Sequence, residues 1–174
     1  MKLLTQALLA LAAMFRLLPL NALAAMHCVD VNSTNATPPY ASWATAATNI
    51  QNAVNAATAG DEIVVTNGTY NPVSVGLVRQ PLSIRSVNGP QVSIISAGGR
   101  HGYACAHLTN GFGSATLSGF TLRDGYANPG GGAYNCTLNN CTLIGNSATS
   151  IPLAIRLRFQ AEAQATACSI TDEL

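Results

Sequence analysis

Charged side chains are scarce in this 174-residue sequence. Lys, Arg, Asp and Glu together make up 9% of it, against roughly 25% of an ordinary globular protein. The formal net charge is +1, and neither a basic arm nor an acidic tail is present. The balance argues against a nucleic-acid partner and against electrostatic attachment to an anionic membrane. The polar surface must be built from Asn, Ser, Thr and Gly, which suit turns between short strands better than solvated helices.

The sequence also lacks an apolar run long enough for a stable membrane span. Lys2 precedes a mostly apolar run over residues 3–15, which Arg16 interrupts, and Ala22-Leu23-Ala24 supplies small residues at a cleavage site. Residues 1–24 are therefore predicted to be a signal peptide. The alternatives are a buried N-terminal helix or initiation at Met26. We expect an exported protein, extracellular or at the cell surface, with the periplasm as the other compartment.

Metal-ligand spacings are missing as well. The five cysteines form no C-x-x-C pair, and no His lies at a zinc-like distance from them: Cys28, Cys105, Cys136, Cys141 and Cys168. Cys141 takes the place that Phe120 holds one repeat earlier, which predicts an inward-facing apolar filler, with a disulfide as the alternative. Neither a metal site nor a cofactor is predicted.

What the sequence does have is an internal repeat. The segment 117–127 (LSGFTLRDGYA) matches the segment 138–148 (LNNCTLIGNSA), with Leu, Thr, Leu and Ala at equivalent places. Gly119 corresponds to Asn140, and both residue types readily adopt the left-handed conformation of a tight turn. A strand, a corner and a second strand at this period are typical of one coil of a β-solenoid.

Short strands recur through the rest of the chain, with Gly- and Asn-containing turns between them. They are expected at 29–31, 61–70, 73–75, 82–87, 92–95, 105–108, 115–122, 133–138 and 141–144. Since no helical pattern lies among the later ones, the sequence favours an all-β parallel β-helix over residues 61–150, with about four coils. A β-sandwich is the runner-up.

One convincing helix precedes the strands. Trp43, Ala47, Ile50, Val54 and Ala57 form an apolar stripe at helical period. Ser42 is the expected N-cap and Gly60 the stop. Residues 25–60 are thus predicted to form a strand, a Pro-rich loop and an α-helix that caps the exposed N-terminal end of the coils.

Several sequence segments then suggest a family. These are ATNIQNAVNAATAGDEIVVTNGTY, LSIRSVNGP, LSGFTLRDGYA and GGGAYNCTLNNCTLIGNSA. Over residues 29–150 the chain resembles the right-handed parallel β-helix proteins of the pectin lyase-like superfamily. More narrowly, it is similar to large exported bacterial β-helix proteins of unassigned function. The resemblance implies a right-handed coil, and the superfamily includes lyases and hydrolases of acidic polysaccharides.

The resemblance stops at Ser150, because residues 151–174 contain neither Gly nor Asn and the repeat vanishes. This tail is either a C-terminal cap or the product of a truncated or shifted reading frame that replaced further coils. The mixture of a strand-like alternation with a helical stretch favours the second interpretation.

No catalytic residues are predicted. A glycosidase needs two carboxylates about 5 to 10 Å apart, and Asp124 is the only acid within the clear coils, with no second acid one period away. A relic or fragment of a polysaccharide lyase or glycoside hydrolase remains the alternative function, and a non-functional fragment is a third.

Binding has a better signal. Arg79, Arg100 and Arg123 recur at nearly the interval of the internal repeat, and Tyr103 and Tyr126 recur at the same interval as the second arginine pair. If each interval is one coil, these side chains line one flank as a ladder that an acidic polysaccharide would complement. The alternative is that they are solvated turn residues in loose registry. The sequence therefore favours an exported structural, adhesive or glycan-binding module, and it sets no oligomeric state.

Overall fold

The structure is a computed structural model. It describes residues 24–74, 82–108, 115–128, 130–134 and 136–148, together with a short strand at 170–171. The predicted signal peptide, apart from Ala24, and the predicted tail, apart from that strand, lie outside the described residues. Arg79 and Cys168 lie outside them too.

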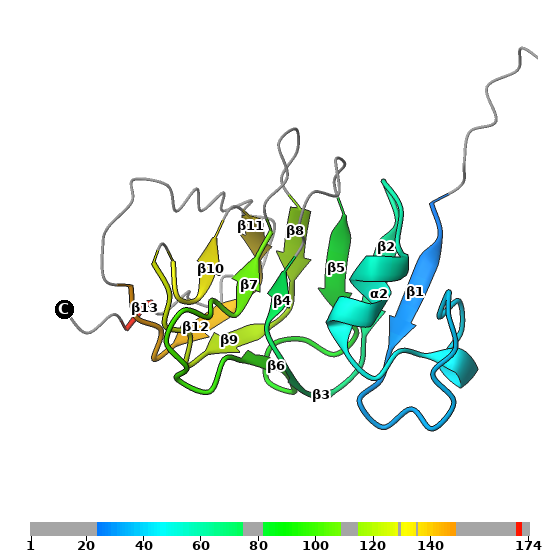
Figure 1. The fold of residues 1–174 in the computed structure, drawn as a ribbon, viewed down its shortest axis with the longest axis horizontal. Coiled ribbons are helices and arrows are strands. Elements are labelled where there is room, and N and C mark those ends of the chain that lie inside the picture. The colour runs from blue at the N-terminus through cyan, green and yellow to red at the C-terminus, as the bar shows by residue number, and fades with distance from the viewer. Residues whose placement is uncertain are drawn as a thin grey trace, which may run out of the picture.

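Three parallel sheets make up most of the fold (Figure 1). Sheet A contains, in spatial order, β1 (Met26–Val29), β2 (Glu62–Val65), β5 (Ser83–Ser86), β8 (Ala115–Ser118) and β11 (Cys136–Asn139). Sheet B contains β3 (Gly68–Tyr70), β6 (Ser93–Ser96), β9 (Thr121–Arg123), β12 (Thr142–Ile144) and β13 (Ile170–Thr171). Sheet C contains β4 (Val73–Ser74), β7 (Ala106–His107) and β10 (Ala133–Tyr134).

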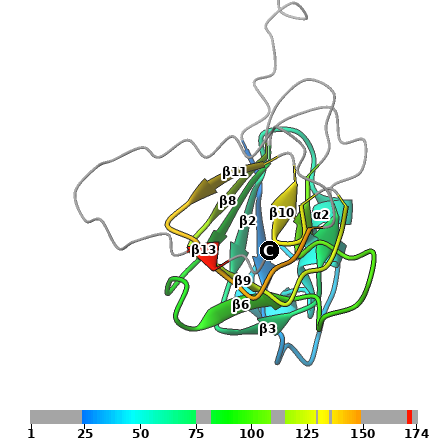
Figure 2. The ribbon, with the colours of Figure 1, turned by 90° about the vertical axis from the view of Figure 1, so that its left-hand side faces the viewer.

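From β2 to β12 the chain visits sheets A, B and C in strict rotation, and each visit adds a strand beside the previous one. Viewed from the C-terminal end, the strands of the three sheets lie on three sides of a common interior (Figure 2). Every pairing between named strands is parallel. An antiparallel sandwich, the runner-up from the sequence, therefore does not describe these strands.

Columns of apolar side chains fill this interior. In sheet A, Ile63 pairs with Ile84, Ile84 with Leu117, and Leu117 with Leu138. In sheet B, Ile95 lies opposite Leu122. The side chains of Ile63, Ile84, Ile95, Leu117 and Leu122 are fully buried. Such stacks of branched aliphatic residues suit parallel sheets whose inner face is completely covered.

The internal repeat corresponds to direct pairing. Leu117 lies opposite Leu138, and Leu122 lies opposite Leu143. The corner that separates β8 from β9 falls at Gly119, with φ of 76°, and its equivalent Asn140 has φ of 47°. The predicted left-handed corners are thus confirmed, and they divide the single strand expected over 115–122 into two.

The predicted helix is wrong over its first half. Trp43–Thr45 form a separate 3-10 turn (η2), and the α-helix α2 spans only Ile50–Ala56. Asn49 rather than Ser42 is its N-cap, because the Asn49 side chain accepts the Asn52 amide at 2.8 Å. Ala47 pairs with β1 instead of coiling: its amide donates to the Cys28 carbonyl at 2.9 Å. Backbone pairing to a sheet edge has overridden the helical pattern here.

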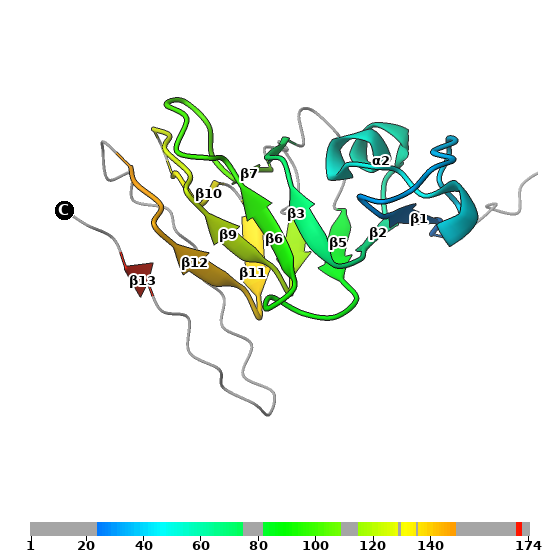
Figure 3. The same cartoon turned by 90° about the horizontal axis from the view of Figure 1, so that it is seen from below.

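The same segment closes the N-terminal edge of sheet A. On the side of β1 away from β2, the Cys28 amide donates to the Tyr40 carbonyl at 2.7 Å, and the Asp30 amide donates to the Ala47 carbonyl at 2.8 Å. Helix α2 buries Ile50, Ala53 and Val54 and lies on the side of the fold that sheet C occupies further along (Figures 2 and 3). The loop, rather than the helix, therefore protects the strand edge that the sequence analysis assigned to the helix.

The described part of the chain contains no helix with the length and apolar character needed to cross a lipid bilayer.

Leu117 and Leu138 offer a matched test of the columns, because they hold the same repeat position one turn apart. Leu117 is fully buried, whereas Leu138 is partly exposed at the end of its column. We expect Leu117→Ala to lower the free energy of unfolding by about 2–5 kcal/mol, as buried leucines do, and Leu138→Ala to cost less than half as much. Urea unfolding of both variants measures this. Equal losses would contradict the stacking order.

Asp61 gives a pH-dependent prediction. Burial alone would raise its pKa, but hydrogen bonds from the Thr58 amide, His27, the Ala25 amide and the Thr58 hydroxyl lower the pKa from 3.8 to about 2. The folded state thus prefers the carboxylate, so this stabilisation is complete above about pH 5 and disappears as the pH falls through about 2. It amounts to at most about 2.5 kcal/mol. Between pH 5 and pH 2 the free energy of unfolding should fall less steeply with pH for Asp61→Asn than for the unmodified protein, as urea unfolding at each pH would show.

Candidate functional site

A groove of about 720 Å³ runs along the corner between sheets B and C. Its walls come from four places: α2, the turn from β3 to β4, the segment that follows β6, and β7. Its polar lining consists of Gln51, Thr69, Asn71, Ser96, Arg100, Tyr103 and His107. Segments far apart in sequence therefore meet at this corner.

Backbone hydrogen bonds hold the segment after β6 in place. The Gly99 amide donates to the Asp124 carbonyl at 2.7 Å, and the Gly102 amide donates to the Tyr126 carbonyl at 2.7 Å. Both glycines have positive φ, 68° and 88°, where a residue with a side chain would be strained. The backbone is thus fixed against the next turn of the chain. The side chains of Arg100 and Tyr103 are exposed, Tyr103 to 55%.

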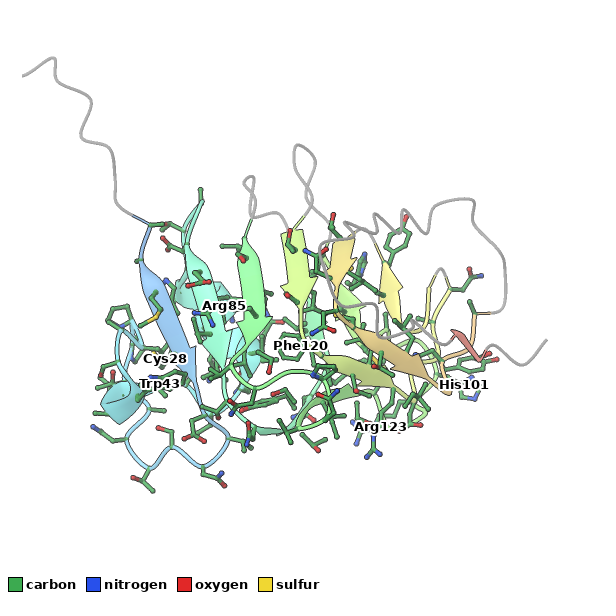
Figure 4. The ribbon with its side chains drawn as sticks, turned by 180° about the vertical axis from the view of Figure 1, so that it is seen from behind. Cys28, Trp43, Arg85, His101, Phe120 and Arg123 are labelled. Carbon is green, nitrogen blue, oxygen red and sulfur yellow. The ribbon has the colours of Figure 1, made fainter. Side chains whose placement is uncertain are left out.

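Two of the five predicted binding residues, Arg100 and Tyr103, line the groove, whereas Arg123 and Tyr126 do not. Arg79 lies outside the described residues. Tyr126 bridges to Tyr103 and packs its ring on His101, with centroids 4.1 Å apart. The side chain of Arg123 points outward from the lower edge of sheet B, while Phe120 lies among the strands (Figure 4).

The predicted arginine ladder is wrong for Arg100 and Arg123. Arg123 pairs with Ser96, the last residue of β6, and not with Arg100, which follows later in the chain. The connection from β7 to β8 is longer than the one from β10 to β11, so this turn of the chain takes up more sequence than the internal repeat does. The structure does bring Tyr103 and Tyr126 together, but through an isolated antiparallel bridge.

The charge of the groove comes from Arg100. The other two described arginines of the strands form ion pairs, Arg85 with Glu62 at 2.6 Å and Arg123 with Asp124 at 3.4 Å. Within the described ranges Arg100 makes no ion pair, and no Asp or Glu is among the lining residues. A guanidinium without an ion-pair partner and an exposed aromatic ring in the same groove suit an anionic ligand with a flat apolar face.

Asp124 has no second carboxylate among the partners that the described residues give it. Asp124, the acid singled out from the sequence, is engaged by Arg123 and by the Ser96 hydroxyl at 3.3 Å. Nor do three or more His, Cys, Asp or Glu side chains gather in the described part of the chain in a way that could hold a metal ion.

Sequence reasoning missed the other five polar lining residues, Gln51, Thr69, Asn71, Ser96 and His107. Gln51 lies on α2, and Asn71 lies in the turn before β4. No local pattern marks them, because only the rotation of the chain through three sheets brings them to one corner.

Three of the cysteines are thiols of low reactivity. Cys28, Cys105 and Cys136 are free. Burial raises the pKa of all three, that of Cys105 to about 11 and that of Cys136 to about 12. Cys141 is partly buried and donates to the Asn139 carbonyl at 3.3 Å. It packs against the core as the predicted filler does.

A comparison of the chain with protein-family models, with curated proteins and with solved structures finds no match.

These thiols allow a labelling test. At pH 8 a thiol with a pKa of about 11 is ionised to only about one part in a thousand, and the thiolate is the nucleophile. We expect Cys28, Cys105 and Cys136 to resist iodoacetamide in the native protein and to react fully in urea, as peptide masses would show. Rapid native labelling of Cys105 would contradict the burial described here.

Proposed function

We propose that the chain is an exported right-handed parallel β-helix module that binds glycans in the groove between sheets B and C. Strict rotation through three parallel sheets supports this architecture. Right-handed connection is the rule for parallel strands joined by crossovers. Its role is structural or adhesive, in the extracellular space or at the cell surface.

The observation that carries the proposal is that Arg100 and Tyr103 line one groove whose described lining has no carboxylate. A guanidinium forms strong, often bidentate hydrogen bonds to carboxylates. An exposed tyrosine face can pack against the apolar face of a sugar ring. Gln51 and Asn71 add amide groups that can bond sugar hydroxyls. An acidic polysaccharide satisfies all of these features.

The alternative is a relic of a polysaccharide lyase or glycoside hydrolase. It ranks second because Asp124 is engaged elsewhere and no second described acid faces it. Incubation with pectate-type and neutral glycans tests this alternative directly. Unsaturated or reducing products that disappear in Asp124→Ala would make it the better assignment.

Binding is tested with two groove variants and two controls. We expect Arg100→Gln to weaken binding to a pectate-type polysaccharide by about 10- to 100-fold, the usual worth of a hydrogen bond to a charged group. Tyr103→Ala should weaken binding to both acidic and neutral glycans. Titration calorimetry measures both, and added salt should affect only the acidic ligand.

The matched controls are Arg85→Gln and Arg123→Gln. Each removes one arginine that does not line the groove, and each should bind as the unmodified protein does. If Arg100→Gln binds no worse than these controls, the groove is not the binding site.

A further inference from the structure

Asp61, the residue before β2, has a buried carboxylate, and one of its two oxygens accepts a hydrogen bond from a backbone nitrogen. Its Oδ2 accepts hydrogen bonds from the Thr58 amide at 2.6 Å, the Thr58 hydroxyl at 3.0 Å and His27 Nε2 at 3.0 Å. Its Oδ1 accepts from the Ala25 nitrogen at 2.8 Å, its one described donor. The residue is only 4% exposed.

The surroundings of this carboxylate are closed on the protein side. His27, 3% exposed, directs Nε2 at Asp61 and Nδ1 at the Pro39 carbonyl, 2.6 Å away. His27 is the one titratable side chain that the described residues place against Asp61.

On the outer side lies Ala25. Its carbonyl accepts the Glu62 amide at 2.9 Å, which extends the pairing of β1 with β2 by one residue and fixes its position. Ala24 and Ala25 are both exposed. The bond between them is also the one that follows Ala22-Leu23-Ala24, the small-residue pattern of a cleavage site. The nitrogen that cleavage would release is therefore the nitrogen that Asp61 already binds.

We propose that Asp61 is a binding site for the processed N-terminus of this chain. A peptidase hydrolyses the Ala24–Ala25 bond: water adds, Ala24 keeps a new carboxylate, and the Ala25 nitrogen becomes an α-ammonium. That ammonium then forms an ion pair with Asp61 Oδ1 in place of the amide hydrogen bond. The inference rests on the export part of the proposed function and is independent of the groove.

The exchange strengthens the contact for a physical reason. The amide hydrogen bond to the carboxylate is already charge-assisted, and an α-ammonium adds the attraction of a full opposite charge, which counts most where the carboxylate is buried. Processing would thus fasten β1 to the rest of sheet A, while the unprocessed chain has only a neutral donor at Oδ1. Strand β1 is therefore more stably attached to sheet A after the signal peptide has been removed.

The composition makes the test unusually specific. Lys2 is the sole lysine in the sequence, so a chain that begins at Ala25 has one primary amine, its α-amine. Reaction with acetic anhydride therefore removes that single charge, and reductive ¹³C-methylation gives one amine signal that can be followed by NMR.

The experiment uses the full chain as exported from an expressing cell. Its N-terminal sequence is expected to begin at Ala25. The proton dissociation constant of the ¹³C-labelled amine should be at least tenfold lower than in Asp61→Asn, and Glu62→Gln, which alters an adjacent acid that bonds Arg85 instead, should leave it unchanged. Acetylation should lower the unfolding temperature of the unmodified protein and of Glu62→Gln, but not of Asp61→Asn.

A start at a residue other than Ala25, or an amine that titrates alike with and without the Asp61 carboxylate, overturns the proposal. If Asp61→Asn does not fold, the acetylated and free forms of the unmodified chain still decide it, since equal unfolding temperatures contradict an ion pair. Glycan binding is measured on the same samples, so that a failure of the groove proposal can be told from a failure of the Asp61 proposal. If the protein does not bind glycans but the dissociation constant of its amine still depends on Asp61, only the groove proposal is contradicted.

Discussion

Burial of the inward-facing aliphatic columns is the constraint on which the rest of the molecule depends. Each side chain of the column Ile63, Ile84 and Leu117 covers the next one, while the parallel backbone bonds set the spacing between them. No described strand is long enough to be stable alone, since even β1 and β2, among the longest, are only a few residues in length. The burial is therefore shared between neighbours, and each turn of the chain is stable only against the one before it.

This constraint explains which parts of the fold the sequence could predict. Residues that stack on copies of themselves must repeat, so the internal repeat revealed both the pairing of Leu117 with Leu138 and the corners at Gly119 and Asn140. The stretch before the repeat has no such copy. There the apolar residues recur at helical spacing and led to a wrong helix prediction, because Ala47 is buried by pairing with β1 and not within a helix. A small apolar residue such as alanine fits a helix or a sheet edge equally well, and here the unpaired edge of β1 determines which one forms.

The candidate site was harder to predict, since it is made of residues that do not stack. Arg100 and Tyr103 were singled out because they recur at nearly the interval of the internal repeat, and both do line the groove, although Arg123 pairs with Ser96 and not with Arg100. Connections between strands differ in length, so spacing measured across them does not give register. Gln51 and His107 come from different elements, α2 and β7, and carry no shared signal in sequence.

The unequal connections have a consequence for how such a protein can change. Along sheet A, the step from Ile84 to its partner Leu117 takes up far more sequence than the steps on either side of it, yet the inner columns stay in line. Compared with the preceding turn of the chain, the described part of the added length lies at two junctions between sheets, the connections from β5 to β6 and from β6 to β7, and the second of these lines the groove. Under the proposed function, the residues that recognise the ligand would differ from those that fill the interior. New specificities can arise by exchange or growth of a junction, without the compensating core substitutions that most binding sites demand.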